Sequence, residues 1–273
     1  MPSNRAEYRR FQLDRKKHVN QLARAAESAL LPFVRDMRAR VSRGIDPKKA
    51  LPNRKEIESD LISALAPAAS ITFNAAMLHG LQQAERYYGR TLPILSRLRK
   101  AVGSDILILK ITEEEAANLG INTTRATVFE ESTFGKIKTI APNFIDSLRR
   151  MVDTSIAESE GRRELIARII TFEGQTKRTA ARIAQTETTR LFNDGKLRGY
   201  KLSTVVKGKL WQTNPFGSGQ VRHAGVAGLN GQQVGLEEKF SVMGESLDYP
   251  GDPAGSAWNI ISCLCSMRPV TGR

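Results

Sequence analysis

The sequence predicts an α+β protein, with a mainly helical N-terminal region followed by a compact lobe in which helices pack on a small antiparallel sheet. Through roughly the first 200 residues, apolar side chains recur every three or four positions, which is typical of helices that bury one face. Beyond that point short alternating segments and turns rich in glycine and proline replace the helical pattern. A content of 40% hydrophobic and 26% charged residues over 273 positions indicates a globular chain.

The N-terminal arm is expected to be one long helix from about Arg5 to Arg43. Pro32 lies inside this run and should kink or break it, and Gly44 should end it. A helix with one apolar stripe is not stable alone in water, so the stripe must be covered by the rest of the chain or by a partner. The stripe consists of Val19, Leu22, Ala23, Ala26, Leu30, Phe33, Val34, Met37 and Val41.

More helix follows the arm. The segment "NRKEIESDLISALA" carries a cap at Asn53 and is interrupted by Pro67, after which a further helix continues. A helix restarting at Pro93, a short strand over 105–111 and a capped helix over 112–120 are expected next. We place the boundary between a helical region, 1–103, and a C-terminal domain, 104–273, where the helical pattern gives way to this short strand.

The second half of the chain begins with three helices and ends in strands and turns. "TRATVFEESTFG" is expected to be a strand or a loop, followed by a helix from Lys136 to Ala157. "RRELIARIITFEG" should form a helix that ends at Gly174, before a separate helix from Arg178 to Tyr200. "VVKGKLWQTN" alternates like a strand, and a final short strand is expected within "NIISCLCSMRPV". No apolar run approaches the roughly 20 residues of a membrane helix.

A glutamate stands at the centre of an apolar helix face. One face of the expected Arg178–Tyr200 helix consists of Ala180, Ile183, Ala184 and Leu191. Glu187 falls near the middle of that face. A buried carboxylate is either a catalytic group with a raised pKa or one half of a structural ion pair. The pair is favoured, because no second carboxylate or histidine in the helix faces the same way.

The partner of Glu187 is expected to come from outside its own helix. Arg182 and Arg190 project to other sides on a helical wheel, which leaves Arg222 as the candidate. In this interpretation, a Glu187–Arg222 pair joins the helix to the C-terminal lobe.

The charge of the chain is strongly basic and unevenly placed. The formal net charge is +14, and residues 1–55 hold 15 lysines and arginines against 5 acidic residues, whereas residues 201–273 hold 7 against 5. Such an excess is typical of contact with a polyanion or with an acidic protein surface, and a solvated helix face is the alternative. The cations expected to face the polyanion are Arg9, Arg10, Arg15, Lys16 and Lys17.

His223, Cys263 and Cys265 are the candidate metal ligands. Two thiolates and an imidazole give three zinc ligands, with Asp252 or water as the fourth. In a terminal strand the two cysteines would point to the same side. The alternative is that both are small side chains packed in the core, and a disulfide between residues two apart would be strained. We therefore expect reduced cysteines and no obligatory cofactor beyond this zinc candidate.

The order of the C-terminal segments resembles one known family. It runs "RIAQTETTRLFNDGKLRGY", Trp211, "RHAGVAGLNGQQVGLEEKF", "YPGDPAG" and "CLC", and it resembles the phage Mu F-protein-like minor head proteins, also called phage head morphogenesis proteins. The resemblance covers roughly residues 164–267, a little over a third of the chain.

The resemblance implies a non-enzymatic virion protein. Members of the family are expected inside the capsid head near the portal vertex, present in few copies, where they assist head assembly and the packaging or delivery of DNA. The implied partners are the portal protein, the inner capsid and double-stranded phage DNA, with no membrane and no small-molecule substrate. The protein would reside in the host cytoplasm during assembly, and the basic arm would contact DNA or the portal.

A head-associated enzyme is the competing class. Glu158-Ser159-Glu160 is similar to the Glu-x-Glu of arginine-directed ADP-ribosyltransferases, but the supporting Ser-Thr-Ser strand is not evident. A nuclease would use His223 beside the basic charge, but the clustered acids or second histidine of that chemistry are not evident in the sequence.

Overall fold

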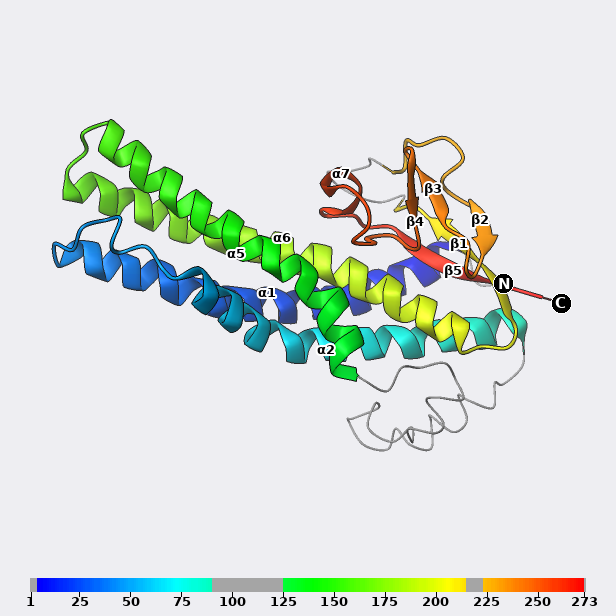
Figure 1. Ribbon diagram of the computed structural model, residues 1–273. Coiled ribbons are helices and arrows are strands. Elements are labelled where there is room, and N and C mark those ends of the chain that lie inside the picture. The colour runs from blue at the N-terminus through cyan, green and yellow to red at the C-terminus, as the bar shows by residue number, and fades with distance from the viewer. Residues whose placement is uncertain (1–3, 90–124, 215–222, 273) are drawn as a thin grey trace. The chain divides into compact units, whose positions relative to one another are not determined.

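The computed structural model describes residues 4–89, 125–214 and 223–272. It confirms the α+β class, with long helices first and a small antiparallel sheet in the C-terminal part (Figure 1). The chain forms two compact units, and each combines two segments: Met1–Ala68 with Phe129–Ala184, and Ala69–Val128 with Gln185–Arg273. The expected boundary at 103 and 104, the helix at Pro93, the strand over 105–111 and the helix over 112–120 lie outside the described residues.

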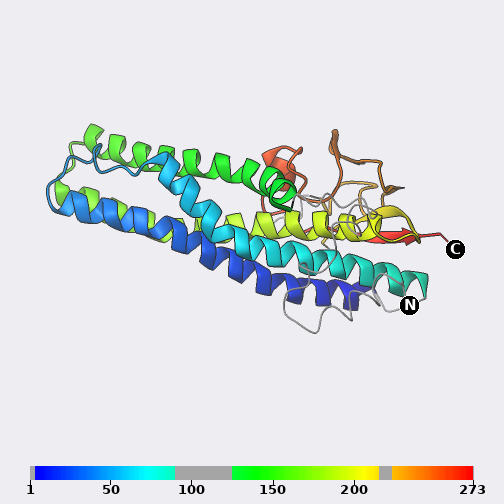
Figure 2. The same ribbon diagram turned by 60° about the horizontal axis from the view of Figure 1, so that its bottom comes forward.

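The first unit is built from four long helices. They are α1 (Asn4–Ser42), the first part of α2 (Arg54–Tyr88), most of α5 (Arg125–Ala157) and the first part of α6 (Arg162–Lys201). Figures 1 and 2 show the α1–α2 connection and the α5–α6 turn at the same end of this unit. The apolar stripes face inward, so the cover that the arm needs comes from the chain itself. The buried core includes Leu22, Ala26, Leu30, Val34, Met37, Val41, Ile57, Leu61, Leu65, Phe144, Leu148, Val152, Leu165 and Ile169.

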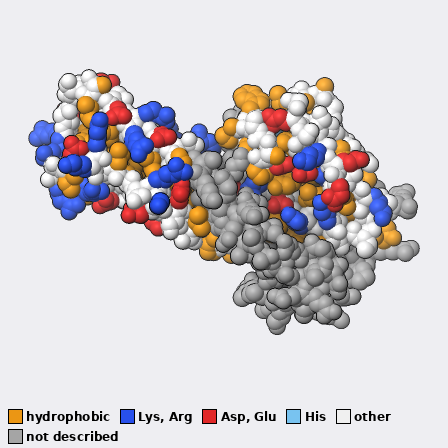
Figure 3. Space-filling view, viewed as in Figure 1, with side chains coloured by type: hydrophobic (Ala, Val, Ile, Leu, Met, Phe, Trp, Pro, Cys, Tyr) orange, Lys and Arg blue, Asp and Glu red, His pale blue; other side chains and the backbone are white. Residues whose placement is uncertain are grey.

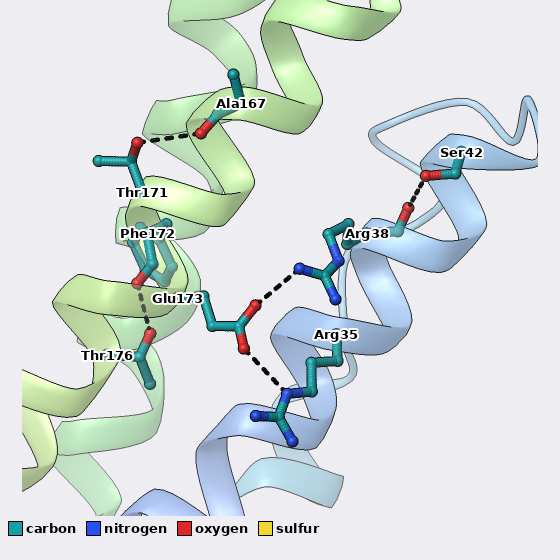
Figure 4. Close-up of polar contacts among 8 residues, drawn as sticks. All are labelled: Arg35, Arg38, Ser42, Ala167, Thr171, Phe172, Glu173 and Thr176. Atoms are coloured by element: carbon teal, nitrogen blue, oxygen red, sulfur yellow. Dashed lines mark hydrogen bonds and ion pairs between the residues drawn. The ribbon is translucent and has the colours of Figure 1, made fainter.

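An ion pair joins α1 to α6 within this unit. Glu173 accepts from Arg35 Nε at 3.0 Å and from Arg38 Nη1 at 3.1 Å, so one carboxylate bridges two arginines one turn apart (Figure 4). The Glu173 side chain is only 16% exposed, whereas the side chains of Arg35 and Arg38 are 54% and 39% exposed. Such a half-exposed pair fixes the rotation of the two helices relative to each other more than it adds stability.

The helices are longer than the sequence suggested. α1 and α2 run through Pro32 and Pro67 without a break, α6 runs through Gly174, and the segment expected as a strand or loop forms the start of α5. Pro32 and Pro67 are both exposed, so the missing backbone hydrogen bond faces water, where its carbonyl partner can be hydrated. Buried apolar residues on both sides of each break point hold the helix continuous.

The second unit contains the sheet. β1 (Val206–Gln212) is central in a three-stranded antiparallel sheet of order β2-β1-β5, between β2 (Gln233–Gly235) and β5 (Ser266–Thr271). In the β1–β5 register Trp211 lies opposite Met267, and both are buried. β1 confirms the expected "VVKGKLWQTN" strand, and β5 forms only the last part of the expected terminal strand.

A hairpin and a single helical turn complete this unit. β3 (Phe240–Val242) pairs with β4 (Glu245–Leu247), and α7 (Ala257–Ile260) follows the "YPGDPAG" turns. The hairpin, the sheet, α6 and the end of α2 share one hydrophobic core. Its largest members include Leu81, Tyr200, Trp211, Leu229, Phe240, Leu247 and Met267.

Glycines allow α2 and α6 to approach closely within this unit. A Cβ added to Gly195 would lie 2.5 Å from the carbonyl oxygen of Phe73, and one added to Gly80 would lie 2.7 Å from that of Lys196. Gly199, one turn after Gly195, lies equally tightly against Met77. These three positions therefore admit no side chain.

α2 is also the one helix of the described residues that is long and apolar enough to cross a membrane. An 18-residue window within it has a mean hydropathy of 1.6, and 31% of that window is buried. The expectation that no run approaches membrane length was therefore wrong as a statement about composition. Core helices of soluble proteins pass the same test, and the C-terminal part of α2 contributes Met77, Leu81 and Ala84 to the core.

Candidate metal centre and the polar core of α6

His223, Cys263 and Cys265 converge in the second unit, and all three are buried. Nδ1 of His223 lies 3.4 Å from Sγ of Cys263 and 3.4 Å from Sγ of Cys265. The cysteines are not in a strand as expected, because β5 begins only at Ser266. They lie in an irregular segment after α7, in which Ser262 has a φ of 55° and donates its N–H to Thr186 Oγ1 at 3.0 Å.

The surroundings of His223 orient its ring. Nε2 lies 3.1 Å from Oδ1 of Asn259 on α7, and the ring meets Trp211 edge-on at 5.8 Å between centroids. An amide oxygen only accepts, so Nε2 carries a proton, and Nδ1 is directed at the two sulfurs. Histidines that bind metals are oriented in this way by a hydrogen bond from the opposite nitrogen.

The pKa values of the two thiols are shifted in opposite directions. The pKa of Cys263 is well below its usual value, first because Cys265 donates a hydrogen bond to it and then because of His223, while burial opposes the shift. The pKa of Cys265 is raised, because it is the donor in that bond and because it is buried. Cys263 is therefore the first of the pair to become a thiolate, which is the form that binds a metal.

The spacing of the three atoms fits a metal ion. Zinc bonds of about 2.3 Å to sulfur and about 2.05 Å to nitrogen, at a tetrahedral angle, separate the two ligand atoms by about 3.6 Å. The observed separations of 3.4 Å are close to this value, and all three ligand atoms lie within 4.8 Å of one another. The group could therefore hold a metal ion after small shifts.

Asp252 is not the fourth member of this group. Its carboxylate accepts from the backbone N–H of Asp248 at 2.7 Å and from that of Ala254 at 2.9 Å. Both oxygens are thus engaged in the turn that contains the two prolines, which is the usual role of aspartate in such turns.

Glu187 is buried, as expected, but its partner lies in its own helix. Glu187 Oε2 accepts from Nε of Arg190 at 2.8 Å, and the two residues are 5% and 1% exposed. The expectation that Arg190 points elsewhere was wrong, because residues three apart are neighbours on a helix and the long arginine side chain reaches back over one turn. Arg222 lies outside the described residues, and Arg182 is exposed.

The ion pair belongs to a larger set of buried charges. Burial opposes the charged form of Arg190, but Glu187, Tyr249 and Asp194 outweigh it and raise the arginine's pKa. Burial raises the pKa of Asp194 above its usual value, and Arg198 offsets only part of that rise. The α6 helix thus carries a structural charge cluster through the core of the second unit.

Polar side chains of α6 bind the backbone of the C-terminal segment. Asn193 Nδ2 donates to the carbonyls of Pro250 at 3.0 Å and Cys265 at 3.1 Å, and Thr189 donates to that of Cys263 at 2.5 Å. Further along, Lys196 Nζ donates to Ser266 Oγ at 2.7 Å, and Tyr200 donates to the carbonyl of Met267 at 3.1 Å.

Sequence reasoning missed these residues, although one signal was available. From position 187 to 200 every residue except Arg198 is buried, so the polar side chains there occupy all sides of a buried helix. The segment "ETTRLFNDGKLRGY" has many polar residues and no apolar majority. This composition indicated a helix whose polar side chains form hydrogen bonds on all of its faces.

The residues predicted to contact a polyanion do not share one environment. Lys16 and Lys17 are exposed, but Arg15 is 2% exposed, so the prediction for Arg15 was wrong. Arg15 is followed three residues later by His18, which is also buried, so both lie on the inward face of α1. The side chains of Arg9 and Arg10 lie outside the described part of the chain.

The Glu-x-Glu motif is committed to an ion pair. Arg168 donates to Glu160 from Nε at 2.6 Å and also contacts Glu158. These bonds lower the pKa of Glu160, chiefly through the hydrogen bond from Arg168, although the group is accessible. The two glutamates thus close the turn between α5 and α6.

Comparison of the chain with protein-family models, with curated proteins and with solved structures finds no match.

Proposed function

We propose that this chain is a non-enzymatic minor head protein of a phage, located inside the capsid near the portal vertex. The observation that carries the proposal is where the residues of the family-like motifs lie. Asn193 of the helix motif, Trp211, His223 of the glycine-rich segment and the Cys-x-Cys pair all contribute to one core in the second unit. A shared set of mutually packed motifs is what a common fold requires.

The polar groups of these motifs support a structural role. Glu187 is bonded to Arg190, Asn193 to backbone carbonyls, and His223 to Asn259. Catalytic groups need access to a substrate, whereas these side chains are almost completely buried. The helical first unit, with its basic surface, suits a protein that contacts DNA and an acidic portal surface.

The experiment that tests the proposal is a cryo-EM map of intact particles and of the isolated portal complex. Density for this chain at the portal vertex, at a copy number well below that of the major capsid protein, is the expected result. A chain that is absent from purified heads, or that turns over a soluble substrate as a free monomer, would refute it.

We further propose that zinc is the metal of the His223–Cys263–Cys265 group. Sulfur and imidazole ligands in near-tetrahedral spacing are those of zinc, and the metal would hold the His223 loop to the segment after α7. Purified protein should contain about one zinc per chain, and chelation should make both thiols react with a thiol reagent. Cys263 and Cys265 are the only cysteines, so the reagent reports on this pair alone. If both thiols react slowly in protein that contains no metal, the two cysteines serve only to pack the core.

A further inference from the structure

The two turns at one end of the first unit form a concentrated basic surface. Residues 40–55, which include the α1–α2 connection, hold six lysines and arginines and one acidic residue. The α5–α6 turn adds Arg162 and Arg163 at the same place. A Cβ on Gly44 would lie 3.2 Å from Nη2 of Arg162, and Lys48 Nζ lies 3.6 Å from Asp153 Oδ1 of α5, so the two turns are in contact.

The acidic side chains near these turns already have other partners or offset a helix end. Asp46 accepts from the backbone N–H groups of Lys48 and Lys49, and Glu158 and Glu160 are held by Arg168. Glu56 and Glu164 are exposed, but they stand in the first turns of α2 and α6, where they offset the positive ends of those helices.

Five exposed cations are left without an acidic partner among the described residues. We call them the basic tip, and none takes part in an ion pair there, whereas Arg54 and Lys48 do. The basic tip consists of Arg43, Lys49, Lys55, Arg162 and Arg163.

We propose that the basic tip is a surface that binds the phosphate backbone of duplex DNA. Like charges gathered without counter-charges repel one another, and a polyanion relieves that repulsion while releasing its own counterions. Figure 3 shows Lys and Arg side chains gathered at this end of the helical unit.

The location differs from the one expected from the sequence. The prediction placed the contact at the beginning of α1, where Arg15 is buried, whereas the basic tip follows the end of α1. The inference rests on the proposed DNA contact of this protein and names the surface that makes it.

The test is DNA binding by the full-length chain over a range of salt concentrations. The tip variant replaces Arg43, Lys49, Lys55, Arg162 and Arg163 with glutamine. The matched control replaces five other exposed cations, Arg24, Arg86, Arg178, Lys207 and Lys239, with glutamine and so has the same net charge. A third variant, Lys16→Gln with Lys17→Gln, tests the beginning of α1.

The tip variant should lose up to about 4.5 units of the slope of log K against log salt, at about 0.9 per phosphate contact. The control should keep most of the wild-type slope, and all variants should keep the wild-type melting temperature because the changed side chains are exposed. A tip variant that binds like the control would overturn the inference, and loss only in the Lys16/Lys17 variant would return the contact to the arm. Wild-type protein that binds no DNA would refute the proposed DNA contact itself, and the basic tip with it. Competition by polyglutamate as strong as by DNA, at equal charge, would assign the tip to an acidic protein instead.

Discussion

Replacing Glu187 tests whether the buried ion pair of α6 is structural. Glu187→Ala removes the carboxylate that lies 2.8 Å from Arg190 Nε and leaves a guanidinium that is 1% exposed without its counter-charge. Breaking a buried pair in this way costs about 3–5 kcal/mol, because the remaining charge cannot be hydrated. Glu187→Gln keeps the shape and one acceptor, so a loss of about 1–3 kcal/mol is expected.

A double variant separates the cost of an orphaned charge from the net value of the pair. Glu187→Leu combined with Arg190→Met removes both charges and retains most of the volume, and such replacements are often neutral or stabilising. Its free energy of unfolding should therefore lie much nearer to wild type than that of either single substitution, with a coupling energy of about 2 kcal/mol or more.

The assay is urea unfolding followed by tryptophan fluorescence. Both tryptophans, Trp211 and Trp258, belong to the second unit, so the signal reports on the unit that contains the pair. Lys207→Gln, a change at an exposed lysine of the second unit, is the control and should shift stability by less than about 1 kcal/mol. Wild-type stability in Glu187→Ala would refute the reasoning.

Three further predictions, made with five substitutions, test other parts of the fold. Gly195→Ala and Gly199→Ala should each lower stability by about 1–3 kcal/mol because a Cβ meets the α2 backbone, whereas Gly174→Ala, in open space in the same helix, should raise it by about 0.5–1 kcal/mol in thermal melts. Asp194→Asn should be more stable than wild type at neutral pH and equally stable in acid. Because the pKa of Asp194 is raised in the folded protein, wild type loses stability as the pH rises from the ordinary aspartate pKa through the pKa of the folded state. Thermal melts of both proteins across pH would record this difference. Glu173→Gln should cost at most about 1 kcal/mol, and high salt should reduce the difference; a larger, salt-independent loss would mean that the bridge to Arg35 and Arg38 is more than a surface pair.

Periodicity predicted the helices well and their ends poorly. The apolar stripe of α1 required a continuous helix, and the structure has one from Asn4 to Ser42. Pro32 and Gly174 looked like breaks because local rules consider only the backbone near them. Burial of residues on both sides outweighs the cost of one missing hydrogen bond or of one flexible residue, and that burial cannot be read from a short window.

The candidate site was visible where residue types are rare. With three histidines and two cysteines in the chain, His223, Cys263 and Cys265 were conspicuous, and the structure brings them together. Asn193 and Lys196 were not conspicuous, because polar residues on helices usually face water. Their partners are backbone carbonyls about 60–70 positions away, and no spacing rule connects a side chain to a carbonyl at that distance.

Two separate sets of contacts hold the segment that follows α7, one to its backbone carbonyls and one to its cysteine side chains. From α6, Thr189 and Asn193 bind the carbonyls of Cys263 and Cys265, while both sulfurs face His223. Ordering such an irregular segment costs about 1–2 kcal/mol of backbone entropy per residue, and the hydrogen bonds from α6 offset part of that cost without a metal. His223 is bonded to Asn259 and faces the two thiols. A metal at the sulfurs would therefore join the glycine-rich loop that begins at His223 to a cysteine segment that the helix already holds.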